Sequence, residues 1–186
     1  MHTFVVVSGL PGSGKTTLAA ELAKHLEIAH LDKDLILEAY FRAEAEVTAE
    51  RRNELSRRAD SELKKAALSL QSAVLSSWWR HPRAVRDSGT PVQWLQDGGI
   101  KVVEVYCRCS AEVAAHRFET RQRHTGHGDD RRNRDHLREQ LVEAESLGPL
   151  FPEAALMCDT AAPVPPATVS SLASQVRALG SAPSEA

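Results

Sequence analysis

The feature of this 186-residue chain that most constrains its fold is a glycine-rich segment near the N-terminus, VVVSGLPGSGKTT at residues 5–17. The β-branched run before the glycines is typical of a buried strand. Leu18, Leu22 and Leu26 follow at the spacing of one helix face. The segment therefore predicts a strand, a tight turn and a helix. The backbone N–H groups of such a turn and the positive end of the helix favour a bound phosphate.

The turn fits the Walker A pattern, Gly-x-x-x-x-Gly-Lys-Thr, from Gly9 to Thr16. In this pattern the lysine, here Lys15, reaches the β- and γ-phosphates of ATP, and the hydroxyl of Thr16 is a ligand for Mg²⁺. The expected nucleotide-binding residues are Gly9, Leu10, Pro11, Gly12, Ser13, Gly14, Lys15, Thr16 and Thr17.

The rest of the chain alternates between strand-like and helix-like segments, which predicts an α/β fold with a parallel sheet covered by helices on both faces. Strands are expected at residues 3–8, 28–31, 73–79, 102–109 and 154–158. Helices are expected at residues 16–26, 35–42, 48–71, 111–123, 135–147 and 166–179. The length favours one domain over residues 1–179, followed by a flexible tail at 180–186.

Composition argues against several functional classes. The formal net charge of −2 provides no broad basic surface for nucleic acid or an anionic membrane. No apolar run approaches the ~20 residues that span a bilayer, and the N-terminus lacks the pattern of a signal peptide. The three cysteines include no Cys-x-x-Cys pair, which favours reduced thiols over structural zinc. A cytoplasmic protein is expected.

Two carboxylates, Asp32 and Asp34, follow the second predicted strand. The carboxyl end of a parallel strand lies at the same edge of the sheet as the phosphate turn. One carboxylate could accept a proton from an attacking hydroxyl, and the other could hold Mg²⁺ through water. The structural alternative is that Asp34 caps the helix that follows it.

Taken together, the Walker A strand and this Asp-x-Asp resemble the P-loop small-molecule kinases of the adenylate-kinase-like group. That group includes gluconate kinase, shikimate kinase, chloramphenicol phosphotransferase, the zeta-toxin kinases and the 5′-polynucleotide kinase domain. The chain also resembles an AAA-type P-loop ATP-binding protein. The resemblance implies a P-loop NTPase fold with strand order 2-3-1-4-5, a lid that carries arginines, and ATP and Mg²⁺ as cofactors. It implies Asp34 as the base and Asp32 as the carboxylate on the metal or substrate side.

The resemblance extends to arginines near the lid, which is expected at about residues 121–134. Arg117 and Arg121 are four residues apart, so a helix at 111–123 would place them on one face. Similarity to adenylate-kinase-like proteins implies that Arg117 lies against the adenine and that Arg121 reaches the phosphates and acts in catalysis. Arg123 and Arg132 flank a polar, glycine-containing loop at 124–133, which is expected to be mobile, and could close over the phosphoryl group, as could the neighbouring Arg131.

Residues for the acceptor molecule are expected after the third predicted strand, where Trp78 and Trp79 precede Arg80. Successive residues of a strand point to opposite faces, so at most one tryptophan would line a pocket. Trp79 and Arg80, with Asp32 and Asp34, are the predicted acceptor-binding residues. His124 and His127 lack further ligands at metal-binding spacing, which disfavours a metal site there.

The leading interpretation is a kinase that transfers the γ-phosphate of ATP to a hydroxyl of a small molecule such as a metabolite, sugar, nucleoside or antibiotic. A nucleotide-gated switch or NTPase without an acceptor is the main alternative, but the chain has no Asn-Lys-x-Asp for guanine and no acid after the third strand. A polynucleotide 5′-kinase is disfavoured by the near-neutral charge, because no basic groove is indicated. A toxin-like kinase of cell-wall sugar precursors stays open, as does the choice between monomer and homodimer.

Overall fold

A computed structural model of the chain describes residues 2–129 and 133–181. Within these residues the chain forms one five-stranded sheet in which every neighbouring pair of strands is parallel. The strands are β1 (His2–Gly9), β2 (Ala29–Asp32), β3 (Ser72–Ser76), β4 (Ile100–Arg108) and β5 (Ala155–Asp159). The order across the sheet is β2-β3-β1-β4-β5, as the resemblance to P-loop small-molecule kinases implies.

Six α-helices connect or follow these strands in the described part of the chain. They are α1 (Lys15–Leu26), α2 (Lys33–Phe41), α3 (Ala49–Leu68), α4 (Ala111–Thr120), α5 (Arg134–Leu147) and α6 (Pro166–Ser181). Three short 3₁₀ helices are described as well: η1 (Gln93–Gln96), η2 (Thr125–His127) and η4 (Pro152–Ala154).

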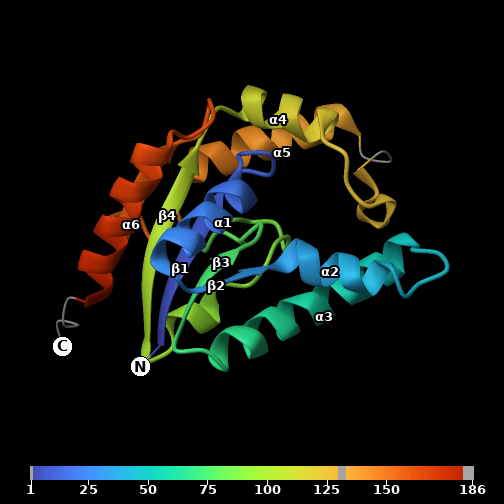
Figure 1. Cartoon of the computed structure of the whole chain (residues 1–186). Helices are drawn as coiled ribbons and strands as arrows, with labels where there is room; N and C mark the ends of the chain where they lie inside the picture. The colour runs from blue at the N-terminus through green and yellow to red at the C-terminus, as the bar shows by residue number, and fades with distance from the viewer. Residues whose placement is uncertain (1, 130–132, 182–186) are drawn as a thin grey trace.

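The central strand β1 separates two hydrophobic layers because its apolar side chains alternate between the faces of the sheet. Val5 and Val7 pack with residues of α1 and α6. Phe4 and Val6 point to the other face, where they pack with α3 and η1. Figure 1 shows α1 and α6 on one side of the sheet and α3 on the other. The helices thus cover both faces, as expected for a parallel sheet.

Two further helix pairs stand at the end of the sheet where the strands terminate. Helix α4 packs on α5 through Ala114, Phe118 and Leu141. Helix α2 packs on α3 through Phe41 and Leu55. In Figure 1 the two pairs lie apart, with the N-terminal end of α1 between them. The site therefore forms where β1, β2 and β4 lead into α1, α2 and α4.

Several predicted boundaries are wrong, and one of them matters for the site. Helix α4 ends at Thr120 rather than at residue 123, because Arg121 adopts an extended backbone. Arg117 and Arg121 consequently do not lie on a continuous helix face. Strand β3 ends at Ser76, so the two tryptophans fall in the loop beyond it. Helix α6 runs to Ser181, past the expected end at residue 179, and residues 182–186 of the expected tail lie outside the described residues.

A buried carboxylate fixes the strand that leads into the phosphate loop. Glu104 on β4 is fully buried and accepts hydrogen bonds from the Ser8 hydroxyl and from the backbone N–H groups of Leu150 and Phe151. A buried carboxylate is tolerated only with such partners. Glu104 therefore joins the end of β1 to the segment that follows α5.

Candidate active site

The loop between β1 and α1 is shaped by its glycines. Gly9, Gly12 and Gly14 all have positive φ, a region that other residues rarely adopt. A Cβ on Gly9 would lie 2.5 Å from the Cys107 carbonyl oxygen, and a Cβ on Gly12 would lie 2.4 Å from the Ala114 carbonyl oxygen. The loop is thus packed tightly against β4 and α4, with its backbone N–H groups at the N-terminus of α1.

Lys15 is held inside this loop. The residue is only 9% exposed, and its ammonium group donates a 2.7 Å hydrogen bond to the carbonyl oxygen of Leu10. Burial lowers the pKa of Lys15 from 10.5 to about 8. A cation that is partly desolvated in this way interacts strongly with an anion placed beside it.

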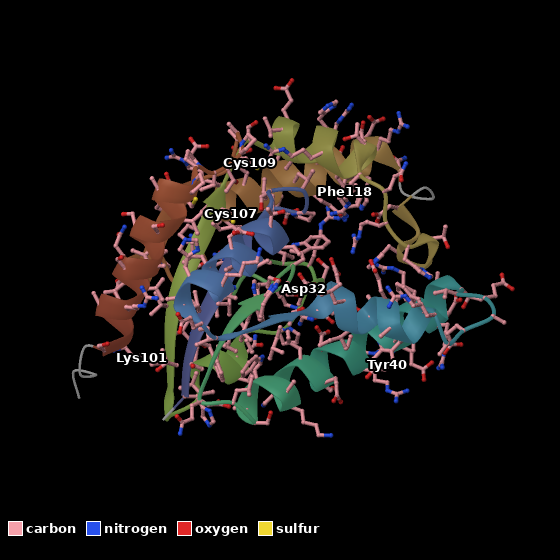
Figure 2. The ribbon with its side chains drawn as sticks, viewed as in Figure 1. Asp32, Tyr40, Lys101, Cys107, Cys109 and Phe118 are labelled. Atoms are coloured by element: carbon pink, nitrogen blue, oxygen red, sulfur yellow. The ribbon has the colours of Figure 1, made fainter. Side chains whose placement is uncertain are left out.

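The Asp32 carboxylate is the centre of a hydrogen-bond cluster at the end of β2. One oxygen, Oδ2, accepts from the hydroxyls of Thr16 at 2.9 Å and Ser76 at 2.6 Å. The other, Oδ1, accepts from the backbone N–H groups of Asp34 at 2.7 Å and Leu35 at 3.3 Å. Asp32 is therefore the N-cap of α2, and the alternative that Asp34 caps this helix is wrong. Figure 2 shows Asp32 where β2 passes into α2.

Asp34 is differently placed, in the first turn of α2. Its side chain is 51% exposed, and one carboxylate oxygen lies 2.7 Å from the Arg123 guanidinium. Because its side chain has no capping role, the Asp34 carboxylate is free of the backbone of α2. The structure thus separates the two acids into a buried structural carboxylate, Asp32, and an accessible one, Asp34.

The arginines after β4 have distinct contacts. Arg117 donates to the carbonyl oxygens of Thr160 at 2.7 Å and Ala161 at 2.8 Å, which ties α4 to the loop after β5. Arg121 stacks on the Phe118 ring at 4.0 Å and pairs with Asp129 at 3.1 Å. Burial lowers the pKa of Arg121 from its ordinary value.

Arg123 is the third arginine of this region that the structure describes. Its guanidinium contacts Asp34, Asp129 and the ring of His127. Arg131 and Arg132 lie outside the described residues, so their predicted positions in the lid have no structural counterpart here.

One cleft of about 720 Å³ joins these groups. Its phosphate-loop side is lined by Pro11, Gly12, Gly14, Lys15, Thr16 and Thr17, with Arg117, Phe118, Arg121, Arg123, His127 and Gln140 also in its wall. Its other side is lined by Asp32, Lys33, Asp34 and Leu37 of α2 and its cap, by Arg52, Asn53, Ser56, Arg57 and Asp60 of α3, and by Ser77, Trp78, Arg80, Asp87, Ser88 and Gly89.

The two predicted residues after β3 have different positions. Arg80 lines the cleft and forms an ion pair with Asp87. Trp79 is 4% exposed, and its indole N–H donates to the Val7 carbonyl oxygen at 3.0 Å. Trp79 is therefore a core residue that braces β1, and Trp78 lines the cleft instead. Neighbouring side chains of an extended chain point in opposite directions, which explains why Trp78 rather than Trp79 lines the cleft.

Sequence reasoning missed other lining residues. Lys33 is buried beside Asp60 at 2.7 Å and donates to Ser56 at 3.0 Å, which joins α2 to α3. The sequence signal for this residue was its position between the two predicted site residues, Asp32 and Asp34. Asp129, the partner of two arginines, lay in a segment interpreted as a mobile loop.

No group of three or more His, Cys, Asp or Glu side chains suited to a metal ion occurs within residues 2–129 and 133–181. Likewise, none of the helices described is long and apolar enough to cross a membrane. All three cysteines are buried and free, in line with the predicted thiols.

A parallel sheet with a Gly-x-x-x-x-Gly-Lys-Thr loop between its central strand and the next helix defines a P-loop nucleotide-binding protein. Residues 4–147 match the model of the family described as an AAA domain, and the chain belongs to this family. The predicted P-loop relationship is thereby confirmed.

Individual relatives agree with this assignment. Shikimate kinase of Mycobacterium marinum is 43% identical over 72 residues, which make up 38% of this chain and 39% of the relative. The match thus spans well under half the length of this curated relative.

Solved structures match over nearly the whole chain. A candidate kinase of Chloroflexus aurantiacus has a TM-score of 0.73 at 24% identity, covering 95% of this chain and 97% of the other. A gluconokinase of Sinorhizobium meliloti has a TM-score of 0.59 at 17% identity, covering 96% and 93%. At these identities the structures establish a shared fold, which confirms the predicted fold class.

Proposed function

We propose that this protein is an ATP-dependent kinase that transfers the γ-phosphoryl group to a hydroxyl of a small molecule. The observation that carries the proposal is the single cleft in which Lys15, Asp34 and Arg121 face one common space. Phosphoryl transfer needs a cradle for the phosphates, a group that orients the acceptor, and cations where charge develops. All three requirements have a side chain in this cleft.

The nucleotide would bind along the phosphate-loop side of the cleft. Backbone N–H groups of residues 9–17 and the N-terminus of α1 suit the phosphates, and Lys15 would lie against the β- and γ-phosphates. Arg117 fixes the loop at Thr160 and Ala161, so adenine would bind between this loop and α4. Planar guanidinium groups are suited to stacking on a base.

Mg²⁺ fits the oxygen atoms of Thr16 and Asp32. The hydroxyl and the carboxylate already face each other at 2.9 Å in the protein, and Mg²⁺ prefers such oxygen donors together with water and phosphate oxygens. When bound, the ion would neutralise charge on the β- and γ-phosphates. Thr16 would bind it directly, and Asp32 would hold its water.

Asp34 would act as the base. Its accessible carboxylate would orient the acceptor hydroxyl and take the proton as the bond between oxygen and the γ-phosphorus forms and the bond to ADP breaks. Arg121 and Arg123 would stabilise the negative charge on the transferring group. The ion pair with Arg123 keeps one Asp34 oxygen engaged, so the acceptor would approach the other.

The acceptor would bind between α2, α3 and the loop after β3. This side of the cleft presents donors next to acceptors, as in the Lys33–Asp60 and Arg80–Asp87 pairs. Such alternation suits a polar molecule with several hydroxyls. A single kinase domain over residues 1–179, a cytoplasmic location and a monomer or homodimer complete the proposal.

A substrate screen tests the proposal. Purified protein, ATP and Mg²⁺ are incubated with hydroxyl-bearing metabolites, sugars, nucleosides and antibiotics. ADP release is measured, and each product is checked by mass spectrometry for an added phosphoryl group. A phosphorylated acceptor supports a kinase, whereas ADP release at one rate with every compound and no phosphorylated product would indicate an NTPase.

A further inference from the structure

The HTGH segment at residues 124–127 forms a compact turn that docks on α2. His124 stacks on the Phe41 ring with centroids 5.5 Å apart, and His127 meets the same ring edge-on at 5.2 Å. A Cβ on Gly126 would lie 2.7 Å from Phe41 ring atoms, so only glycine permits this approach. Phe41 itself is 1% exposed and packs into the interface between α2 and α3. The turn thereby joins the lid to the acceptor side of the cleft.

His127 links two charged groups through its ring. Its Nε2 lies 3.0 Å from the Glu38 carboxylate, and the Arg123 guanidinium lies 2.9 Å from its Nδ1 and 3.0 Å from its Nε2. A neutral ring with its proton on Nε2 can donate to Glu38 while Nδ1 accepts from Arg123. Burial and the charge of Arg123 lower the pKa of His127, which favours this neutral form, although Glu38, Asp34 and Asp129 act in the opposite direction.

Arg123 in turn reaches Asp34 at 2.7 Å. Asp34 and Glu38 are four residues apart on α2 and therefore lie on the same face of that helix. The contacts thus form a closed network that runs from Glu38 on α2 through His127 and Arg123 and back to α2 at Asp34. Within this network His127 is buried, at only 2% exposed.

We propose that His127 is a positioning residue for phosphoryl transfer, which holds Arg123 beside Asp34 and fixes the lid to α2. This inference rests on the proposed kinase function. Although His127 lines the cleft, its ring nitrogens are engaged by Glu38 and Arg123, so it acts through Arg123 in this role. It sets the position of the arginine that meets the transferring group, so its loss would affect the transition state more than the ground state.

The test uses Mg·ADP with aluminium fluoride, which imitates the transferring phosphoryl group. Affinity for Mg·ADP is measured by calorimetry with and without aluminium fluoride in the wild type and in His127→Leu, His127→Gln and His124→Leu. The increase in Mg·ADP affinity that aluminium fluoride produces should be about tenfold smaller in His127→Leu than in the wild type, as for one lost charge-assisted hydrogen bond. Affinity for Mg·ADP alone should stay unchanged.

Three comparisons separate positioning from packing. Glutamine offers both a donor and an acceptor, so His127→Gln should recover most of the gain. His124→Leu is the matched control, because His124 packs on the same Phe41 ring, while the hydrogen bond that its ring forms among residues 2–129 and 133–181 is with the Gly126 N–H of its own turn. In an Arg123→Ala background, His127→Leu should have no further effect, since the two act as a unit.

The opposite results would overturn the inference. An equal loss in His124→Leu, no recovery with glutamine, or a full effect of His127→Leu without Arg123 would make His127 a packing residue. Absence of any gain from aluminium fluoride in the wild type, with the acceptor from the screen present, would instead contradict the kinase function. Amide hydrogen exchange of the ligand-free protein would then decide: the inference predicts faster exchange at residues 123–128 in His127→Leu than in His124→Leu, and equal rates would reject it.

Discussion

The Thr16 hydroxyl donates a hydrogen bond of 2.9 Å to the Asp32 carboxylate, which joins the first turn of α1 to the end of β2. The same carboxylate oxygen accepts from Ser76 on β3. The contact brings together Thr16 and Asp32, the two residues predicted to hold Mg²⁺. These hydrogen bonds also make Asp32 a structural residue, because it is 5% exposed and caps α2.

Asp32→Asn should therefore affect both metal use and stability. The Mg²⁺ concentration needed for half-maximal ATP binding should rise several-fold, since a neutral amide holds the metal's water less strongly than a carboxylate. The free energy of unfolding should fall by about 1 kcal/mol, the usual effect of impaired hydrogen bonds. ATP titrations at several Mg²⁺ concentrations and denaturant unfolding measure the two effects.

Ser76→Ala is the matched control for this prediction. It removes one hydrogen bond from Asp32 and leaves the carboxylate in place. It should lower stability and leave the Mg²⁺ requirement nearly unchanged. A Mg²⁺ requirement in Asp32→Asn equal to that of the wild type would exclude Asp32 from the metal site.

Lys15 should destabilise the ligand-free protein near neutral pH. Its pKa is about 8 in the folded chain and 10.5 as the ordinary value, so the folded state binds fewer protons between about pH 8 and 10.5. The contribution of this group to the free energy of unfolding therefore increases with pH in that interval. At pH 7 the buried charge costs up to about 3 kcal/mol, the equivalent of the pKa shift.

Lys15→Met should accordingly raise stability at pH 7 and weaken ATP binding by about one to a few kcal/mol, as for a lost charge-assisted contact. The stability advantage should shrink as the pH rises from 8 toward 10.5. Denaturant unfolding of both proteins across this range measures it, and calorimetry measures ATP binding. A variant with lower stability at pH 7 and unchanged ATP affinity would contradict both parts.

Arg121→Ala should lower turnover more than ATP binding. Arg121 lies in the cleft on the Phe118 ring, and the negative charge that it meets is greatest in the transition state. Steady-state kinetics and calorimetry give the two quantities, with Arg138→Ala as a control because Arg138 is exposed and pairs with Glu119. Loss of ATP binding with full turnover at saturating ATP would make Arg121 a ground-state ligand instead.

The phosphate loop could be predicted because its signal is local: glycines at fixed spacing between a strand and a helix leave few alternatives. The order of the strands came from the resemblance to P-loop kinases, since alternating strands and helices alone predict only a parallel sheet. The separate roles of Asp32 and Asp34 could not be read in the same way. Either acid could have capped α2, and the choice depends on Thr16 and Ser76, which lie far away in the sequence.

The lid was harder to predict for a related reason. Polar residues with a glycine are typical of a mobile loop, which is what the sequence of 124–133 predicts. The turn at 124–127 is instead ordered by Phe41, a residue of another helix. Likewise, the loop at Trp78 and Trp79 turns the second tryptophan into the core, where Val7 accepts its N–H. Such long-range partners leave no local pattern in the sequence.

Asp34→Asn most directly tests the claim that the phosphoryl group goes to an acceptor hydroxyl. The side chain is half-exposed and caps nothing, so folding and ATP binding should be nearly those of the wild type. The measurement is the rate at which the acceptor found by the screen gains a phosphoryl group, followed by mass spectrometry at saturating ATP and Mg²⁺. The account predicts a rate lower by about 10²-fold or more, the usual scale for loss of a general base. A rate within a fewfold of the wild type would contradict it.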